Sequence, residues 1–138
     1  MDGRFSRRCG LVDGVVERAR AAQRQAYAPY SNFRVGAALE SARGEVFVGC
    51  NVENASYGLT ICAERVAVGQ AVTAGARQFS RIVVVTDSEP PAAPCGACRQ
   101  VLAEFGADLV VEAVGPSSTK RWRIRDLLPD AFGPESLA

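Results

Sequence analysis

The apolar residues of this chain change their spacing several times, and each spacing predicts one type of element. Near the start they recur every three or four positions, which places them on one face of a helix. The residues on this face are Leu11, Val15, Ala19, Ala22 and Ala26. We expect the helix to end before Ala28-Pro29, because the residue that precedes a proline disfavours helical backbone.

Short apolar runs separated by turn residues then predict strands. Phe33–Glu40 and Glu45–Cys50 flank Ser41–Gly44 and should form a β-hairpin. Ile82–Val85 is wholly apolar and rich in β-branched residues, which is typical of a central strand buried on both faces. The other expected elements are an irregular polar segment at 51–60, helices at Cys62–Thr73 and Cys95–Phe105, strands at Leu109–Val114 and Lys120–Arg125, and a last helical turn at Leu127–Phe132.

The order of these elements predicts an α/β fold. Strands that alternate with helices form a sheet covered on both faces, so we expect a three-layer α/β/α architecture with a mixed five-stranded sheet. The connection Gly115–Thr119 is too short for the crossover of about a dozen residues that parallel neighbours need. The last two strands should therefore be antiparallel. The chain contains no repeat or linker, so residues 1–138 should form one domain, with 1–10 as a loose N-terminus.

Charge and hydropathy argue against several classes of partner. The chain has 138 residues, a formal net charge of +1, 48% hydrophobic residues and five cysteines. Its dense basic runs, Arg4–Arg8 and Lys120–Arg125, lack the clustered basic face of a nucleic-acid binder. No apolar stretch approaches the ~20 residues of a membrane span, and the first residues do not resemble a signal peptide. We therefore expect a cytoplasmic protein with reduced thiols and with neither a nucleic-acid nor a membrane partner.

The candidate chemistry lies in two short segments, Cys62-Ala63-Glu64 and Pro94-Cys95-Gly96-Ala97-Cys98. Positions three apart share one face of a helix, so Cys95 and Cys98 can point at one ion. Cys62 opens the other predicted helix, and helix beginnings favour thiolates, the form that binds metal. Three protein ligands plus water are typical of a catalytic zinc ion, whereas a structural zinc ion has four protein ligands.

Glu64 lies two residues after the first thiol, and we expect it to transfer protons rather than to bind the metal. It would take a proton from the activated water and pass it to the substrate, while the water attacks an electrophilic carbon. Three thiolates leave the site negatively charged, so a cation is needed nearby. Arg65 and Arg99 each directly follow a key residue and are the candidate donors to sulfur.

Other interpretations of the cysteines remain open at this point. A lone C-x-x-C pair also fits a redox pair or half of a structural zinc site. The additional Cys-Ala-Glu segment and the leading proline favour the catalytic interpretation, and the chain has no histidine to complete a closed site. Cys50 would be a fourth ligand only if the second strand ends at the site. Otherwise we expect Cys9 and Cys50 to be ordinary thiols.

These motifs, with others in the same order, resemble the small cytidine deaminases, which are homotetrameric zinc enzymes of the three-cysteine type. The resemblance extends from about Tyr27 to Phe132. The matching segments are Tyr30-Ser31-Asn32-Phe33-Arg34-Val35-Gly36-Ala37-Ala38-Leu39, Gly49-Cys50-Asn51-Val52-Glu53-Asn54-Ala55-Ser56-Tyr57, Cys62-Ala63-Glu64-Arg65, Pro94-Cys95-Gly96-Ala97-Cys98-Arg99-Gln100-Val101 and Leu127-Leu128-Pro129-Asp130-Ala131-Phe132.

The resemblance implies that one zinc ion per chain is bound by Cys62, Cys95 and Cys98, with Glu64 as the proton shuttle. It also implies a set of residues that bind a nucleoside. Asn51 and Glu53 match residues that hold the ribose hydroxyls, although from the residues alone they would be turn residues. Phe33 matches an aromatic at the pocket, the Ala63 N–H matches a contact to the pyrimidine carbonyl, and Tyr57 and Phe132 match groups that reach a neighbouring subunit's site.

The sequence therefore predicts hydrolytic deamination of free cytidine and deoxycytidine to the uridine forms, with release of ammonia. A carboxylate at Glu53 would repel a phosphate group, so an unphosphorylated nucleoside fits better. One alternative is a deaminase for another aminopyrimidine nucleoside, such as a blasticidin-type antibiotic. Two further alternatives are an enzyme that edits nucleic acids and a zinc module without catalytic activity.

Overall fold

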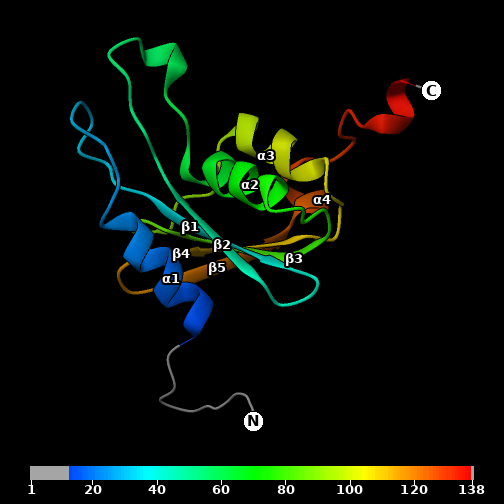
Figure 1. Cartoon of the computed structure of the whole chain (residues 1–138), viewed down its shortest axis with the longest axis horizontal. Coiled ribbons are helices and arrows are strands. Elements are labelled where there is room, and N and C mark those ends of the chain that lie inside the picture. The colour runs from blue at the N-terminus through cyan, green and yellow to red at the C-terminus, as the bar shows by residue number, and fades with distance from the viewer. Residues whose placement is uncertain (1–12, 138) are drawn as a thin grey trace.

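A mixed sheet forms the centre of the computed structural model, which describes residues 13–137 (Figure 1). Its five strands lie in the order β2-β1-β3-β4-β5. Their bounds are β1 (Gly36–Ser41), β2 (Val46–Cys50), β3 (Phe79–Val85), β4 (Val110–Val114) and β5 (Thr119–Arg123). β3 and β4 are parallel, and all other neighbouring pairs are antiparallel. The mixed five-stranded sheet and its antiparallel last pair confirm the prediction.

Helices cover both faces of this sheet, as Figure 1 shows. α1 (Gly14–Gln23) lies on one face, and α2 (Ala63–Thr73) and α3 (Gly96–Ala103) lie on the other. The short helix α4 (Ile124–Leu127) follows β5 and contacts α3. The expected three-layer architecture is therefore confirmed. None of the helices described between residues 13 and 137 has the length and apolar character needed to cross a bilayer.

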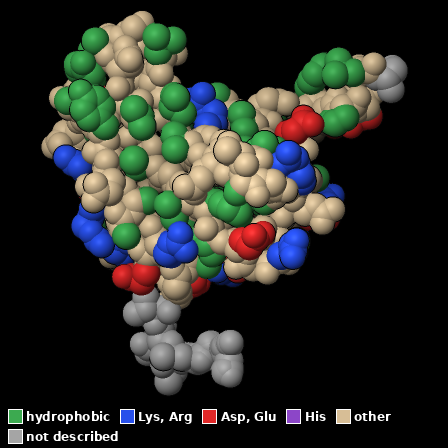
Figure 2. Space-filling model, viewed as in Figure 1, with side chains coloured by type: hydrophobic (Ala, Val, Ile, Leu, Met, Phe, Trp, Pro, Cys, Tyr) green, Lys and Arg blue, Asp and Glu red, His purple; other side chains and the backbone are tan. Residues whose placement is uncertain are grey.

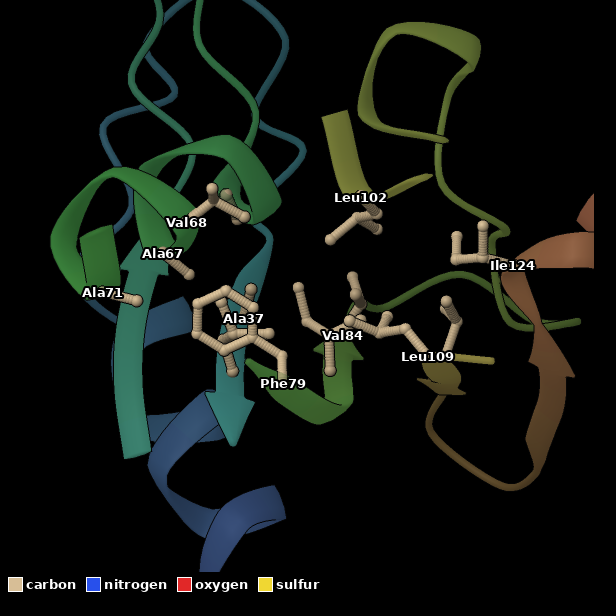
Figure 3. Packing of buried hydrophobic residues seen from close by; sticks show 13 residues of the cluster. Ala37, Ala67, Val68, Ala71, Phe79, Val84, Leu102, Leu109 and Ile124 are labelled. Carbon is tan, nitrogen blue, oxygen red and sulfur yellow. The ribbon is translucent and has the colours of Figure 1, made fainter. Parts of the chain in front are cut away.

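The central strand β3 supplies core residues to both faces of the sheet. Ile82 and Val84 belong to the larger hydrophobic cluster beneath α2 and α3, which Figure 3 shows from close by. Val83 and Val85 belong to a smaller cluster beneath α1. All four side chains are at most 2% exposed. Because successive side chains of a strand point to opposite faces, this wholly apolar run serves two cores at once, as predicted.

Two glycines let helices approach the sheet closely. A Cβ atom on Gly36 would lie 2.0 Å from the carbonyl oxygen of Ala19 in α1. A Cβ atom on Gly49 would lie 2.5 Å from the nitrogen of Ala67 and 2.6 Å from the oxygen of Ala63, both in α2. Only glycine permits such contacts between a strand and a helix backbone. Gly49 therefore fixes how closely the first turn of α2 packs against β2.

Several element boundaries differ from the sequence expectation. α1 ends at Gln23 instead of near Ala26, and β1 begins at Gly36 instead of Phe33. β5 ends at Arg123, because α4 begins at the next residue. The predicted helical turn at Leu127–Phe132 is wrong: Leu128 precedes a proline, which disfavours helical backbone, and a 3₁₀ turn forms at Pro134–Leu137 instead. The expectations for Leu11, Cys9 and the loose N-terminus at 1–10 lie outside the described residues.

Candidate metal centre

Three thiols meet where two helices begin. Cys62 is the N-cap residue of α2, Cys95 is the N-cap residue of α3, and Cys98 lies in the first turn of α3. Their sulfur atoms all lie within 4.8 Å of one another, and the Sγ atoms of Cys62 and Cys95 are 3.9 Å apart. The structure therefore brings together the three cysteines that the sequence predicts as ligands.

The spacing and chemistry of this group fit a zinc ion. With Zn–S bonds of about 2.3 Å, tetrahedral geometry places two bound sulfur atoms about 3.8 Å apart. The 3.9 Å between Cys62 and Cys95 agrees with that spacing. β2 does end at Cys50, but its thiol is not part of the group, and Glu64 is not part of it either. Three protein ligands leave the fourth tetrahedral position for water or substrate.

Arg65 and a neighbouring thiol stabilise negative charge on Cys62. A hydrogen bond from Cys98 is the main cause that lowers the pKa of Cys62 to about 5; burial opposes this effect, and Arg65 adds to it. The Nη2 of Arg65 donates to the Sγ of Cys62 at 3.5 Å, as expected of a donor to sulfur. Cys98 donates its hydrogen bond to Cys62 and therefore holds its proton more tightly, which raises the pKa of Cys98. This environment favours the thiolate form of Cys62, which is the form that binds metal.

Arg99 differs from the sequence expectation. Its Nε donates to the carbonyl oxygen of Pro94 at 2.8 Å, and its Nη1 donates to that of Leu127 at 2.9 Å. These bonds go to the backbone and not to a sulfur atom. Arg99 thus ties the residue before Cys95 to the end of α4, and of the two arginines only Arg65 has a hydrogen bond to a sulfur within residues 13–137.

Glu64 is a buried carboxyl group beside the thiols. It is the second residue of α2 and is 5% exposed. Burial raises the pKa of Glu64 to about 6, and the neighbouring negative charge at Cys62 acts in the same direction. A carboxyl group with such a pKa can both accept and donate a proton near neutral pH. This is the property that a proton shuttle needs.

An open cavity of about 210 Å³ leads to this group. Glu64, Cys62 and Cys95 lie on its wall together with Phe33 and Asn51, two of the predicted substrate-binding residues. Ala63 also lines it, and the first N–H groups of a helix have no partner within the helix. The remaining lining residues are Val35, Thr60, Val84, Thr86, Ala92 and Ala93.

The other predicted substrate-binding residues lie outside this cavity. Glu53 and Tyr57 line an adjoining cavity of about 370 Å³, with Tyr30 and Ser31. Thr60 belongs to both cavities, so they are neighbours. Phe132 lines a third cavity beside α3 and α4, and the structure of the single chain does not bring it to the thiols.

Some lining residues gave no signal in the sequence. Ala92 and Ala93 are small residues in an irregular segment, and nothing but their place before Pro94-Cys95 points to the site. Thr86 had a usable signal. It directly follows β3, and ligands of open α/β sheets bind at the carboxyl ends of such strands.

Fold and site together define a class: an α/β/α sandwich in which three thiols suited to a catalytic zinc ion lie beside a buried carboxyl group. Residues 12–114 match the family model described as the cytidine and deoxycytidylate deaminase zinc-binding region. The chain belongs to this deaminase family. It is 44% identical over 129 residues to the cytidine deaminase of Sporosarcina psychrophila, covering 92% of this chain and 95% of that one. A probable cytidine deaminase of Dictyostelium discoideum is 48% identical over 128 residues, covering 91% and 86%.

Solved structures agree with this assignment. The crystal structure of cytidine deaminase from Burkholderia pseudomallei has 53% sequence identity and a TM-score of 0.83, covering 86% of this chain and 96% of that one. Cytidine deaminase from Mycobacterium tuberculosis has 43% identity and a TM-score of 0.75, covering 86% and 94%. The chain therefore shares the fold of these enzymes over most of its length.

Proposed function

We propose that this protein removes the amino group of free cytidine and deoxycytidine by hydrolysis, forming uridine and deoxyuridine and releasing ammonia. Membership of the deaminase family supports this activity. The single observation that carries the chemistry is the buried carboxyl group of Glu64 beside three convergent thiols, on the wall of an open cavity.

Cys62, Cys95 and Cys98 would hold the zinc ion, and Arg65 would balance part of their charge. Zinc bound there supplies the Lewis acidity that makes water a nucleophile near neutral pH. Glu64 would take one proton from the attacking water and give it to the ring nitrogen, while the water oxygen bonds to the carbon bearing the amino group. Glu64 would then move the remaining proton from that oxygen to the amino nitrogen, so that the carbon–nitrogen bond breaks, ammonia leaves and the oxygen stays as the carbonyl of the product. The pKa of Glu64, about 6, allows this carboxyl group both to accept a proton and to donate one near neutral pH.

The two adjoining cavities suit the two parts of a nucleoside. The base would lie in the cavity with Glu64, beside Phe33 and the N–H of Ala63, and the sugar would extend past Thr60 towards Glu53. Asn51 on one side and Glu53 on the other would hold the sugar hydroxyls. A phosphate group would meet the carboxylate of Glu53 and be repelled, which favours an unphosphorylated substrate.

The decisive experiment measures the loss of cytidine absorbance together with zinc content per chain. We expect turnover by the wild type, loss of turnover after chelation, and recovery when zinc is restored. Glu64→Gln should keep its zinc and lose about 10²–10⁴-fold in kcat, because it cannot transfer the proton. Full turnover by that variant would contradict the proposed role of Glu64.

A substrate panel separates the proposal from its alternative. Cytidine, deoxycytidine and a blasticidin-type nucleoside antibiotic are compared at equal enzyme concentration. Cytidine and deoxycytidine should be turned over far better than the antibiotic, because family membership supports a cytidine substrate. If the antibiotic were turned over better than cytidine and deoxycytidine, the protein would instead be a deaminase for that antibiotic.

We further propose that the protein acts as a homotetramer in which neighbouring subunits complete each site. In the single chain Tyr57 is 75% exposed and Phe132 is 60% exposed. Figure 2 shows hydrophobic side chains gathered over the upper left of the molecule, where the segment 51–61 extends away from the sheet. The exposed apolar residues of this region include Tyr27, Tyr30, Val52, Leu59 and Ile61. A large exposed apolar area is typical of a surface that another chain covers.

Mixed subunits test this sharing of sites. Glu64→Ala and Tyr57→Ala variants are unfolded and refolded together, and light scattering first measures the mass of the assembly. If Tyr57 serves a neighbour's site, a Glu64→Ala subunit can supply it to a Tyr57→Ala subunit. The mixture should then be more active than the sum of the separate variants. Strictly additive activity, or a monomeric mass, would contradict the shared site.

We also propose that residues 1–138 fold as one domain and work in the cytoplasm. All four cysteines within residues 13–137 are free thiols, and a reducing compartment keeps metal-binding thiols from forming disulfides. The full chain should unfold in a single cooperative transition, and cell fractionation should recover it with cytoplasmic markers. Two separate transitions would indicate a second folding unit.

A further inference from the structure

The segment from Tyr30 to Val35, which carries Phe33, is held by two side chains from the chain that follows β2. The Oδ1 of Asn51 accepts from the N–H of Val35 at 2.9 Å, and its Nδ2 donates to the carbonyl oxygen of Phe33 at 2.7 Å. The Oε1 of Glu53 accepts from the N–H groups of Tyr30 at 2.9 Å and Ser31 at 3.2 Å. The N–H of Val35 and the carbonyl oxygen of Phe33 thus bond to a side chain, whereas the sequence predicted strand pairing for residues 33–35.

Ser31 connects the two ends of this segment. Its hydroxyl accepts from the N–H of Phe33 at 3.0 Å and donates to the Oε2 of Glu53. A serine hydroxyl has one proton, and the bond from Phe33 occupies one of its acceptor sites, so its proton is directed at the carboxylate. Ser31 thus joins the position of Phe33 at the metal cavity to the position of Glu53 in the adjoining cavity.

The hydrogen bonds already made limit what these two side chains can offer a ligand. A carboxylate has about four acceptor sites, two on each oxygen. In Glu53 both sites of Oε1 are filled, and one site of Oε2 is filled by Ser31. Asn51 keeps one N–H donor, because its other proton goes to Phe33. One free acceptor and one free donor suit a hydroxyl group, which both donates and accepts a hydrogen bond.

We propose that Ser31 is a positioning residue for substrate recognition: its hydroxyl orients the Glu53 carboxylate so that the remaining acceptor site of Oε2 receives a sugar hydroxyl. This inference rests on the proposed function, since it needs a nucleoside in the two cavities. The hydrogen bond from Ser31 is also the main cause that lowers the pKa of Glu53, which keeps the carboxylate ionised as an acceptor.

The experiment compares substrates with and without the sugar hydroxyls. Wild type, Ser31→Ala and Ser31→Thr are assayed with cytidine and with 2′,3′-dideoxycytidine. Ser31→Ala should lower kcat/KM for cytidine about tenfold, mainly through KM, because a hydrogen bond to a charged group is lost. Ser31→Thr keeps the hydroxyl and should restore most of the activity. With the dideoxy substrate the loss should be much smaller, since no hydroxyl reaches Glu53.

A matched control is Ser41→Ala, at the other end of β1, where the hydroxyl accepts from the N–H groups of Arg43 and Glu45. It should leave both substrates unaffected. If Ser31→Ala lowers kcat/KM by the same factor for both substrates, Ser31 has only a structural role and the inference is wrong. If dideoxycytidine reacts too slowly, the inhibition constants of uridine and 2′,3′-dideoxyuridine replace the turnover comparison. If wild type does not turn over cytidine, the proposed function itself fails.

A second background makes the test independent of the substrate analogue. In a Glu53→Gln variant the carboxylate is already lost, so adding Ser31→Ala should lower kcat/KM for cytidine by less than it does in wild type. Such non-additivity is expected of two residues that act as a unit. Fully additive losses would overturn the proposal, because they would show that Ser31 acts independently of Glu53.

Discussion

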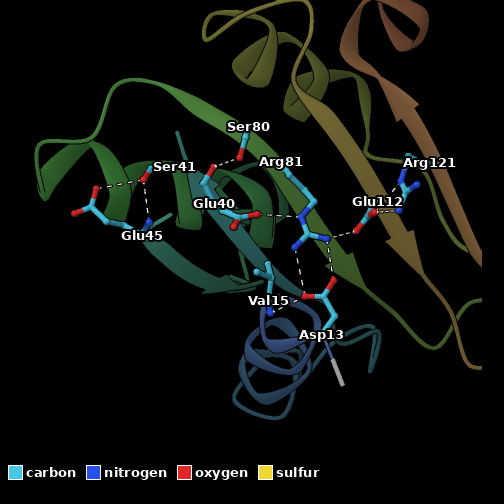
Figure 4. Close-up of polar contacts among 9 residues, drawn as sticks. All are labelled: Asp13, Val15, Glu40, Ser41, Glu45, Ser80, Arg81, Glu112 and Arg121. Carbon is cyan, nitrogen blue, oxygen red and sulfur yellow. Dashed lines mark hydrogen bonds and ion pairs between the residues drawn. The ribbon is translucent and has the colours of Figure 1, made fainter. Parts of the chain in front are cut away.

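Two polar clusters in this molecule differ in how their charges are balanced. Towards the start of β3, Arg81 binds Asp13, Glu40 and Glu112, and Glu112 also binds Arg121, as Figure 4 shows. Every acid in this cluster faces a cation. At the other end of β3, three thiols face one another beside a buried carboxyl group.

The difference shows which cluster is built for function. In the ionic cluster the charges compensate within the protein, so the cluster ties α1, β1, β3, β4 and β5 together. In the thiol cluster like groups converge, and like charges at short range disfavour ionisation of both. Among the buried side-chain nitrogen and oxygen atoms of residues 13–137, the Nε of Arg65 beside this cluster is the one that has no hydrogen-bond partner. A bound cation would compensate the charge of the three thiolates, and clustered ionisable groups with shifted pKa values are typical of functional sites.

The largest effect should come from breaking the thiol cluster. Cys98 is fully buried. Cys98→Ala removes one of three ligands, so we expect the zinc to be lost and cytidine turnover to fall by several orders of magnitude. Metal analysis per chain and loss of cytidine absorbance check this result.

The matched control is Cys50→Ala, which removes a half-buried thiol that is not part of the group. It should keep the zinc and the activity. A Cys98→Ala variant with a full complement of zinc would show that the three thiols do not act together.

The next largest effect should come from breaking the ionic cluster at its most buried member. The side chain of Glu112 is 6% exposed. Glu112→Ala leaves Arg81 partly uncompensated and should lower the free energy of unfolding by about 3 kcal/mol. Urea denaturation measures it. Removing the exposed partner with Arg121→Ala should cost less than about 1 kcal/mol. If both variants cost the same, burial does not set the strength of the cluster.

Gly49→Ala should disturb the metal centre through the backbone. Its Cβ would lie 2.6 Å from the oxygen of Ala63, so the beginning of α2, which carries Cys62 and Glu64, must shift. We expect a loss of about 2 kcal/mol in stability from overpacking, with a fall in kcat/KM. The matched control is Gly69→Ala, in the same helix with no atom within 4 Å, which should stabilise by up to about 1 kcal/mol. Unchanged activity in Gly49→Ala would mean that close packing of α2 is not required.

The two clusters also differ in how far the sequence could predict them. The thiol cluster depends on two local motifs, and the helix beginnings that follow them place the sulfur atoms together, so it was predictable. The ionic cluster depends on residues as distant as Asp13, Glu40, Arg81 and Glu112, which become neighbours only through the order of the strands. No local pattern contains that order.

The boundaries that were predicted wrongly have a similar cause. Phe33 and Val35 alternate with a polar residue as in a strand, but the side chain of Asn51 accepts from the N–H of Val35 and donates to the carbonyl oxygen of Phe33. The turn after Leu127 is helical in pattern, but Pro129 and the positive φ of Asp130 end it. In both places a side chain or a single backbone angle outweighs the periodicity, and such competition is settled only by tertiary structure.

The smallest predicted effect on stability concerns Asp13, which lies at the exposed edge of the ionic cluster. Asp13 caps α1 by accepting from the N–H of Val15 at 3.0 Å and also binds Arg81. Burial, the largest single influence, tends to raise the pKa of Asp13, but Arg81 and the backbone bonds together hold it below its ordinary value of 3.8. A depressed pKa stabilises the fold above the unfolded-state value, and this stabilisation is lost as the pH falls.

Asp13→Asn keeps the cap and removes the charge, which isolates the ion pair. Because the side chain of Asp13 is 44% exposed, solvent screening limits the loss to about 0.5 kcal/mol at neutral pH. The difference from wild type should stay constant well above pH 3.8, shrink as the pH falls through that value, and vanish below the lower folded-state pKa. Urea denaturation over this pH range measures it. A difference that persists at acid pH would show that Asp13 acts as a helix cap alone, and not as a member of the charged network.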